Sequence, residues 1–422
     1  QQVRQQQFFW PFCRSLWKEC VSAVSGQEDA WLNGYRILPQ EINMLEEIMT
    51  SEYNIKSALR ESPAGGHGGD IYRNSVDCDF SINLNPLGMP DAVREALKKS
   101  MERWERYPDP LCQQLTEAIA QKYQIRAETI LCGNGAADLI FQAVLAERPR
   151  RALVLSPSFS EYEQALRAFD CQICVFPLKP EDGFVPDMDR LTEAVADVSG
   201  KKVDMVFFCN PNNPSGIAVK REQVEKLAAF CLRHQVRLIL DECFCEFLES
   251  PRQITMMGLT EDYPNLVILR AFTKTYSMAG LRLGFAVCSD ERLLKTMAAL
   301  RQPWSVSLPA QEAGVAALSV PETYLEKTRR LLREERPFLK KGLEKLGYRV
   351  FDSMANFLLF YDPQEDVRSL WEFCRYQKIL IRDCRNFSGL GPGYYRICIR
   401  SREENSRLLR VLGELEKYGQ MG

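Results

Sequence analysis

The chain of 422 residues is 45% apolar and 26% charged, a balance typical of a globular protein with a well-buried core rather than of a disordered or fibrous chain. Its formal net charge of -2 offers no basic surface to a nucleic-acid backbone. No apolar run approaches the roughly 20 residues that a membrane-spanning helix needs. We therefore expect neither nucleic-acid nor membrane partners.

Cysteine and histidine counts restrict the chemistry further. Fifteen scattered cysteines, an odd number without framework spacing, predict free thiols in a reducing compartment, so we expect a cytoplasmic protein. Cys171 and Cys174 form one Cys-x-x-Cys pair without the second pair that a zinc site needs, and we expect no metal. With only two histidines, His67 and His234, the chemistry must rest mainly on other side chains or on a cofactor.

The first 62 residues differ in composition from the rest of the chain. They are rich in Gln and Glu and contain three of the six Trp. Apolar positions within 39–60 recur at helical spacing, which predicts one or two amphipathic helices. We expect 1–62 to form a helical N-terminal extension.

From about residue 90, short β-branched runs alternate with helical stretches, which predicts an α/β fold. Near-continuous apolar runs suit a mainly parallel sheet that is covered on both faces. The expected strands of this sheet are 151–156, 203–209, 237–241, 266–272 and 283–288.

The texture changes after Pro309, where long charged helices and two strands, 356–361 and 394–400, predict a second, α+β domain. At roughly 100–200 residues per domain the length suits two or three domains. The predicted division is a large domain over 96–309, and a smaller domain made of 63–95 and 310–422.

Four segments carry side chains that could do chemistry. The first, 130–146, is a strand, a Gly-rich turn and a helix that starts at Gly135 and Ala136, where free backbone N–H groups can bind an anion. The second, 207–216, is a strand that enters a Pro- and Asn-rich turn containing Asn213. Taken alone, each is also consistent with an ordinary turn.

The other two segments place charged side chains at strand ends. Asp241 ends the strand of 237–241, where α/β sheets bind ligands, although a helix N-cap is equally common there. Lys274 follows the strand of 266–272 and is either a surface lysine or, where burial keeps it neutral, a nucleophile that forms an imine with a carbonyl. Arg282 lies between two leucines, and such an arginine usually has an anionic partner, for which a phosphate would serve.

In this order the four segments supply a phosphate cradle, an Asn, an Asp at a strand end, and a Lys followed by an Arg, which is the set that a pyridoxal-phosphate site needs. The chain here resembles the fold type I, aspartate-aminotransferase-like superfamily of pyridoxal-phosphate enzymes over about residues 66–415. The resemblance implies pyridoxal 5'-phosphate as cofactor and a homodimer with shared active sites.

Further motifs look like one branch of this superfamily, the branch that holds histidinol-phosphate aminotransferase and the threonine-phosphate decarboxylase of cobalamin biosynthesis. They are HGGD at 67–70, DFSINLNPLGMP at 79–90, YPDP at 107–110, LIRDCRNFSGL at 380–390 and YYRICIR at 394–400. The His-Gly-Gly start is similar to the decarboxylase more than to the aminotransferase. The resemblance thus implies a lyase that decarboxylates a phosphorylated hydroxyamino acid, O-phospho-L-threonine or O-phosphoserine. The alternatives are an aminotransferase of the histidinol-phosphate type and, from another class, a non-catalytic sensor that binds the cofactor.

The resemblance also assigns cofactor contacts residue by residue. Lys274 carries the cofactor as a Schiff base, Asp241 pairs with the pyridinium nitrogen, and Asn213 bonds the ring hydroxyl. Tyr162 stacks on the ring. The cofactor phosphate is contacted by Gly135, Ala136, Thr273, Arg282 and, from the other subunit, Tyr107.

On the substrate side, Arg396 matches the arginine that clamps the substrate carboxylate. Arg382, Asn83 and His67 match positions near the substrate's phosphate or carboxylate. The residues alone leave other interpretations open: His67 could be a loop residue without a ligand, and the two arginines could pair with local carboxylates such as Asp383.

Three positions depart from the pattern of the superfamily. Phe244 replaces a Tyr that bonds the cofactor's ring oxygen in many relatives. Ala271 replaces a hydroxyl residue that helps to hold the cofactor phosphate. Asp70 replaces the more usual Asn of His-Gly-Gly-Asn and brings a negative charge near a site meant for an anion.

Overall fold

A computed structural model describes residues 30–32, 35–37, 67–196, 202–364 and 369–419. The chain divides into two units, 1–66 and 67–422. In the first unit β1 (Ala30–Leu32) pairs antiparallel with β2 (Tyr35–Ile37), so these residues are strands and not the helix that we expected. The helices predicted within 39–60 lie outside the described residues.

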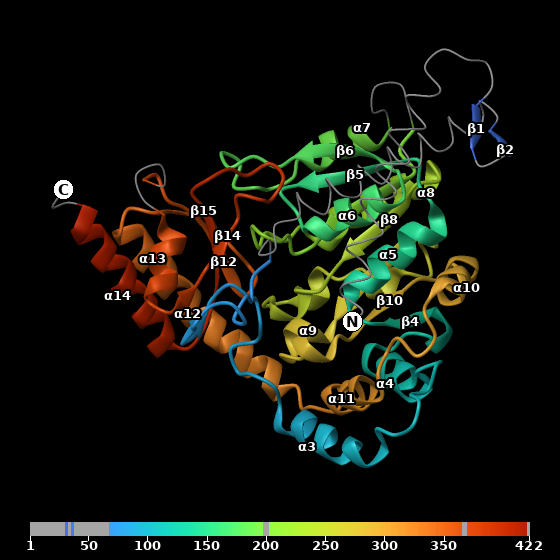
Figure 1. The fold of residues 1–422 in the computed structure, drawn as a ribbon, viewed down its shortest axis with the longest axis horizontal. Coiled ribbons are helices and arrows are strands. Elements are labelled where there is room, and N and C mark those ends of the chain that lie inside the picture. The colour runs from blue at the N-terminus through green and yellow to red at the C-terminus, as the bar shows by residue number, and fades with distance from the viewer. Residues whose placement is uncertain (1–29, 33–34, 38–66, 197–201, 365–368, 420–422) are drawn as a thin grey trace. The chain divides into compact units, whose positions relative to one another are not determined.

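The second unit (Figure 1) is built around a sheet of seven strands in the order β4-β10-β9-β8-β7-β5-β6. β10 runs antiparallel to both of its neighbours, and the other pairs are parallel. The predicted mainly parallel sheet is confirmed. The strands are β4 (Ile130–Gly133), β5 (Arg151–Ser156), β6 (Gln172–Pro177), β7 (Met205–Cys209), β8 (Arg237–Asp241), β9 (Leu266–Ala271) and β10 (Gly284–Val287).

Helices cover both faces of this sheet because its central strands are apolar on both sides. In β7, for example, Val206 and Phe208 enter one hydrophobic core, whereas Met205 and Phe207 enter the other. Each such buried side chain stabilises the fold by about 1.5–3 kcal/mol. One face carries α5 (Ala136–Glu147), α6 (Ser160–Ala168) and α10 (Glu291–Leu300); the other carries α4 (Gln113–Tyr123), α7 (Met188–Ala196), α8 (Arg221–Arg233) and α11 (Leu308–Leu318).

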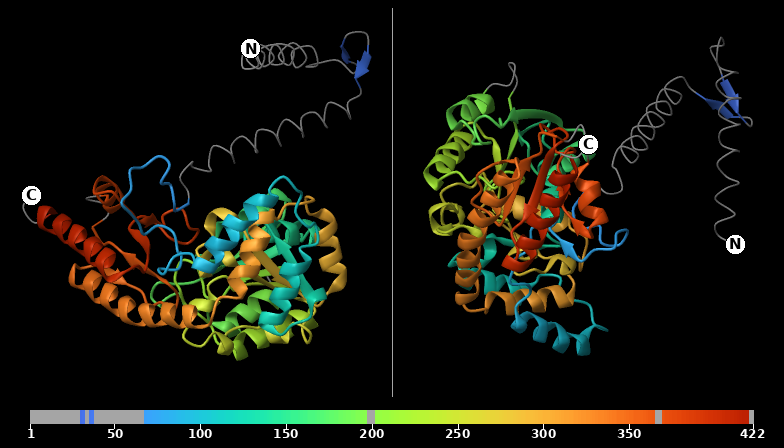
Figure 2. Two further views of the ribbon diagram at one scale, coloured as in Figure 1. Left: turned by 90° about the horizontal axis from the view of Figure 1, so that it is seen from below. Right: turned by 90° about the vertical axis from the view of Figure 1, so that its left-hand side faces the viewer.

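A second lobe has its own core around an antiparallel sheet in the order β11-β12-β15-β14. Figure 2 shows α12 as the long helix that links the two lobes. A short parallel pair, β3 with β13, brings residues near position 78 into this lobe. The elements are β3 (Cys78–Asp79), β11 (Arg349–Val350), β12 (Phe357–Tyr361), β13 (Ile379–Leu380), β14 (Arg382–Asp383), β15 (Tyr394–Cys398), α12 (Thr323–Lys345), α13 (Leu370–Tyr376) and α14 (Arg402–Gly419).

The packing of α11 bears on where the two lobes divide. Ala310, Ala313 and Ala317 of α11 are buried in a core of the seven-stranded sheet, against α4 and α3 (Asp91–Ser100). From Leu332 onward, α12 packs in the core of the second lobe. We therefore propose a division inside α12 rather than at 309, and one that leaves α3 with the large lobe.

The remaining helical elements are short and connect these layers. They are η1 (Met101–Arg103), η2 (Ala127–Thr129), η3 (Cys245–Phe247), η4 (Pro251–Gln253), η5 (Met257–Leu259), α9 (Phe272–Thr275) and η6 (Ala279–Leu281). In the described part of the chain, no helix combines the length and apolar character needed to cross a membrane. The same residues contain no cluster of metal-binding side chains.

Candidate active site

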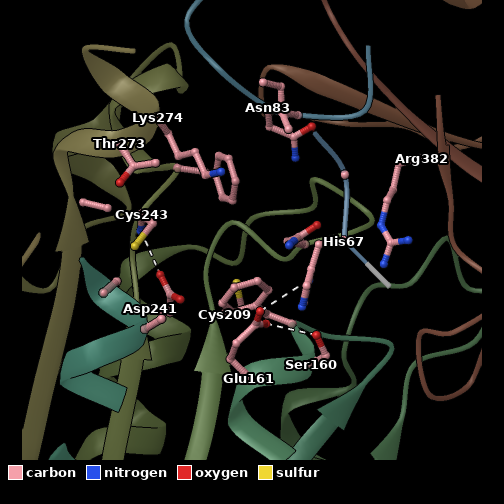
Figure 3. A pocket seen from close by; sticks show the side chains of 18 of the residues that line it. His67, Asn83, Ser160, Glu161, Cys209, Asp241, Cys243, Thr273, Lys274 and Arg382 are labelled. Carbon is pink, nitrogen blue, oxygen red and sulfur yellow. Dashed lines mark hydrogen bonds and ion pairs between the residues drawn. The ribbon is translucent and has the colours of Figure 1, made fainter. Parts of the chain in front are cut away.

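A cavity of about 330 Å³ lies where the carboxyl ends of β7, β8 and β9 face β14 and β15 of the second lobe (Figure 3). This edge of a parallel sheet is the usual place for a ligand. Eleven of the predicted site residues line the cavity: His67, Asn83, Ala136, Tyr162, Asn213, Asp241, Thr273, Lys274, Arg282, Arg382 and Arg396. Gly135 and Tyr107 do not line it.

Lys274 enters the cavity from α9, directly after the end of β9. Burial lowers the pKa of its ammonium group to about 8, and the positive charges of Arg396 and Arg282 act in the same direction. The backbone N–H of Asn85 donates to the Lys274 carbonyl at 3.0 Å and fixes this turn. The neutral, nucleophilic amine is therefore accessible near neutral pH.

Asp241, the last residue of β8, is a buried carboxylate with two hydrogen bonds. Its Oδ2 accepts from the Tyr162 hydroxyl at 2.6 Å, and its Oδ1 accepts from the backbone N–H of Cys243 at 2.9 Å. Among the described residues no cationic side chain forms an ion pair with it. Asp241 is thus held ready for a protonated nitrogen on a ligand.

Tyr162 contacts Asp241, and its stacking on the cofactor ring stays a prediction. Its own ring is buried and stacks on Phe207 with a centroid distance of 4.9 Å. Burial and the Asp241 carboxylate raise the pKa of Tyr162, and the hydroxyl stays a donor to Asp241. The aromatic side chain that lines the cavity nearby is Phe159, edge-on to Tyr162 at 5.7 Å. The spacing of two aromatic residues three apart in 159–162 was the signal for this alternative.

One end of the cavity is suited to an anion. Gly135 begins α5 with φ +85, and a Cβ there would lie 2.7 Å from Nη2 of Arg282, so the guanidinium can approach only because the residue is glycine. The free N–H groups at the start of α5 and the hydroxyl of Thr273 complete the set of donors. Arg282 forms no ion pair within the described chain and donates to the Ala279 carbonyl at 3.2 Å.

The opposite wall carries two arginines. Arg382 in β14 and Arg396 in β15 are direct partners across the strands, and both are buried. Like charges in this arrangement destabilise a sheet unless a ligand compensates them. Burial lowers the pKa of Arg396 to about 10, and Arg382 adds to the effect.

Neither arginine has a carboxylate partner in the described chain. Arg396 donates to Asn213 Oδ1 and to the Ser81 carbonyl, and its Nε has no hydrogen-bond partner among the described residues. Arg382 donates to the Asp383 carbonyl at 2.7 Å and to Asn386 Oδ1 at 2.8 Å. The alternative pairing with the Asp383 carboxylate is wrong, because that carboxylate pairs with a different arginine, at 385.

Asn83 and His67 reach the same end of the cavity. Asn83 is 2% exposed, and its Oδ1 lacks a hydrogen-bond partner among the described residues. His67 Nδ1 lies 3.5 Å from Glu161 Oε1. Asp70 does not line the cavity, and its carboxylate lies 3.7 Å from Arg73.

Phe244 and Ala271, two of the departures from the family pattern, both line the cavity. The Phe244 ring packs edge-on against Phe357 at 5.0 Å, so it fills space where a tyrosine would bring a hydroxyl. Sequence reasoning missed the further lining residues Ser81, Phe159, Glu161, Cys209 and Cys243. Apart from Phe159, their types carry no signal without the fold that brings them together.

Tyr107 lies outside the cavity on the surface. It is 78% exposed, and its ring packs in a tilted arrangement against Trp304 with a centroid distance of 4.7 Å. Within one chain it therefore cannot contact a ligand in the cavity.

Known proteins share the sequence pattern of this chain. Residues 76–412 match the family model described as aminotransferase class I and II. The chain belongs to this family. The predicted resemblance to the aspartate-aminotransferase-like superfamily is thereby confirmed.

Relatives within the class I and II aminotransferase family carry two different activities in their names. The chain is 38% identical to a threonine-phosphate decarboxylase of Salmonella typhimurium, over 82% of this chain and 95% of that protein. It is 32% identical to a histidinol-phosphate aminotransferase of Symbiobacterium thermophilum, over 78% of this chain and 88% of that protein. Among solved structures, the histidinol-phosphate aminotransferase of Clostridium acetobutylicum superposes with a TM-score of 0.74 at 27% identity and covers 81% of this chain and 99% of its own.

Proposed function

We propose that the chain is a pyridoxal-phosphate-dependent decarboxylase of a phosphorylated hydroxyamino acid, with O-phospho-L-threonine as the first candidate substrate, O-phosphoserine as a second, and aminopropanol phosphate as the product from the first. The observation that carries this proposal is the pair of buried arginines, Arg382 and Arg396, which face one another without a carboxylate partner in the described chain. Together with the site at Arg282, the cavity offers binding groups for three anionic groups: a cofactor phosphate, a substrate carboxylate and a substrate phosphate. The 38% identity to a threonine-phosphate decarboxylase supports the same choice.

The residues present fit the cofactor. Arg282, Thr273 and the start of α5 would hold its phosphate, Asp241 its ring nitrogen, Asn213 its ring hydroxyl and Lys274 its aldehyde carbon. The Arg282 guanidinium beside Gly135 and the Asp241 carboxylate, neither of which has an ion-pair partner in the described chain, are the features that the cofactor's phosphate and ring nitrogen would satisfy. When bound, pyridoxal phosphate supplies an electron sink for the electron pair left on the substrate's Cα.

Orientation of the substrate by this chain's arginines decides which bond breaks, because only the bond perpendicular to the cofactor ring overlaps its π system. Arg396 is proposed to hold the carboxylate and Arg382, with His67 and Asn83, the phosphate. Loss of carbon dioxide leaves an electron pair on Cα that must take up a proton. Lys274, with a pKa of about 8, is suited to deliver that proton.

Tyr162→Phe is expected to lower kcat about tenfold and to weaken cofactor binding, because it removes a charge-assisted hydrogen bond from Asp241 while keeping the ring. Steady-state kinetics and cofactor titration by absorbance measure the two effects. Tyr123→Phe is the matched control, since this tyrosine contacts Glu246 and does not line the cavity. Equal kcat and cofactor affinity in both variants would show that the 2.6 Å bond has no functional role.

A homodimer with shared sites is part of the proposal. Five further large apolar side chains are exposed in the segments 101–111 and 300–304, which carry Tyr107 and its neighbour Trp304, and exposed apolar side chains favour a protein contact. They are Met101, Trp104, Leu111, Leu300 and Trp304. The exposed position of Tyr107 fits a residue that serves the cavity of a second copy. The thirteen described cysteines are free thiols, which supports a reducing, cytoplasmic location.

Mixing two impaired variants tests the shared site. Tyr107→Ala and Lys274→Ala homodimers are each expected to lose activity. Unfolded together and refolded, they form hybrid dimers in which one of the two sites has both residues, so activity returns to roughly a quarter of the wild-type value for a statistical mixture. Light scattering gives the oligomeric state. A monomeric protein, or hybrids without recovered activity, would contradict the shared site.

Decarboxylation is tested directly by incubating the cofactor-loaded protein with O-phospho-L-threonine and no 2-oxo acid. Release of carbon dioxide and of the phosphorylated amine is expected. The 32% identity to a histidinol-phosphate aminotransferase makes transamination the second candidate. If products form only when histidinol phosphate and 2-oxoglutarate are supplied, the aminotransferase is the correct function; a protein that binds the cofactor and turns over neither substrate would be a sensor.

A further inference from the structure

Glu161 is an acidic side chain in a cavity built for anions. It lies in the first turn of α6, is 14% exposed, and lines the cavity together with Ser160. The other lining carboxylate, Asp241, is engaged by Tyr162 and Cys243. A free carboxylate here would repel an anionic substrate, so its presence calls for a reason.

The contacts of Glu161 lead to one other side chain of the cavity. Its Oε1 lies 3.5 Å from His67 Nδ1, and its Oε2 accepts from the Ser160 hydroxyl at 3.0 Å. Figure 3 shows both contacts at the rim of the cavity, with Arg382 across from them. Within the described chain Glu161 forms no ion pair with a lysine or an arginine.

The backbone near His67 is anchored, while its ring depends on Glu161. The N–H of Gly69 donates to Ser81 Oγ at 2.7 Å, and a Cβ on Gly68 would lie 2.3 Å from the Ser81 carbonyl oxygen, so this loop is pressed against Ser81. The His67 side chain itself is 64% exposed. Among the described contacts only the one with Glu161 orients the imidazole.

The chemistry of the imidazole then gives the carboxylate a role. Nδ1 can face Glu161 favourably only when it carries a proton, and Nε2 can bind an anion only when it also carries one. Both conditions hold together in the imidazolium ion. We propose that Glu161 is a positioning residue that orients the His67 imidazolium through Nδ1–H, with Nε2–H directed to the phosphate of the substrate.

This inference rests on the proposed function in that it deepens the phosphate recognition of the same cavity. The direction in which Glu161→Gln changes anion binding distinguishes this inference from a purely electrostatic effect of Glu161. If Glu161 acted only as a local negative charge, Glu161→Gln would strengthen the binding of an anion. If Glu161 acts through His67, the same substitution weakens binding.

The kinetic test compares four proteins with cofactor bound: wild type, Glu161→Gln, His67→Ala and the double variant. Glu161→Gln is expected to raise the KM for O-phospho-L-threonine about fivefold, the effect of one lost hydrogen bond, and to leave kcat within twofold. In the His67→Ala background the same substitution is expected to have no further effect on KM, because its partner is gone. Glu163→Gln is the matched control in the same helical turn, where the carboxylate pairs with the exposed Arg167 instead.

A binding measurement keeps the inference testable if the protein does not decarboxylate this substrate. The chain has two histidines, and His234 stacks on Phe230 at the end of α8, so its imidazole NMR signals serve as an internal reference. Inorganic phosphate is expected to shift the His67 signals and not those of His234, with weaker affinity in Glu161→Gln. Tighter phosphate binding in Glu161→Gln, an equal loss in both His67 backgrounds, or unshifted His67 signals would each overturn the inference. Inactive wild type with the expected phosphate response would overturn only the proposed decarboxylation.

Discussion

Lys274→Ala is expected to abolish turnover, by about 10⁴-fold or more, and to remove the visible absorbance of the bound cofactor. The substitution removes the amine that we propose attaches the cofactor and returns a proton to Cα. Absorbance spectra and product formation measure the two losses. Lys295→Ala, at an exposed helical lysine paired with Glu291, is the control that keeps both properties.

Replacement of Lys274 is expected to abolish activity but to stabilise the cofactor-free protein. The pKa of Lys274 is about 8 in the folded protein, compared with 10.5 for an ordinary lysine. Between pH 8 and pH 10.5 the unfolded chain therefore binds more protons than the folded protein, and the free energy of unfolding rises with pH. At neutral pH the buried ammonium ion therefore costs stability. Lys274→Met is expected to raise the free energy of unfolding of the cofactor-free protein at pH 7 by about 2 kcal/mol, measured with urea. A destabilised Lys274→Met protein would show that the ammonium group is well accommodated.

Arg396→Ala is expected to lower kcat/KM by roughly 10²–10³-fold, because the substrate carboxylate would lose a buried, charge-assisted contact and the alignment of its Cα bond. The free energy of unfolding is expected to change by less than about 1 kcal/mol. The lost packing of the guanidinium over Phe357 is offset by removal of the cation opposite Arg382.

The matched control is Arg400→Ala. This arginine follows the same strand, pairs with Glu404 at 2.6 Å and does not line the cavity. The Arg400→Ala protein is expected to be less stable than wild type and to keep the wild-type KM, the reverse of Arg396→Ala. If Arg396→Ala kept the wild-type kcat/KM, the carboxylate would be held elsewhere and the assignment of the two anion sites would fail.

The central sheet could be predicted because its strands are short apolar runs that end at turn residues. The strands predicted at 151–156 and 237–241 match β5 and β8 to the residue. The hairpin of Ala30–Leu32 and Tyr35–Ile37 could not be predicted from a composition that favours helix, because strand formation there depends on pairing between the two segments. The proposed place of α11 in the large lobe could not be predicted for a related reason: a helix rich in alanine does not reveal which core it enters.

The candidate site was predictable in its residue types more than in its contacts. Polar residues at the ends of β8 and β9 follow from the rule for parallel sheets, so Asp241 and Lys274 could be found. The bond from Tyr162 to Asp241 spans 79 positions, and no sequence pattern links the two. The facing of Arg382 and Arg396 depends on the register of two strands, which a shift of one residue would reverse.

The pairing of β3 with β13 sets the order in which the protein can be completed during synthesis. Residues near 78 leave the ribosome early, yet their strand partner is about 300 residues further along. Until the final quarter of the chain has emerged, Cys78 and Phe80 have no core to enter and Arg382 and Arg396 are absent from the cavity. Contacts of such long sequence separation form late and slowly. A nascent chain can therefore build the parallel sheet that carries Asp241 and Lys274 well before Arg382 and Arg396 join the cavity, so the proposed cofactor site can form before the two arginines proposed to hold the substrate are in place.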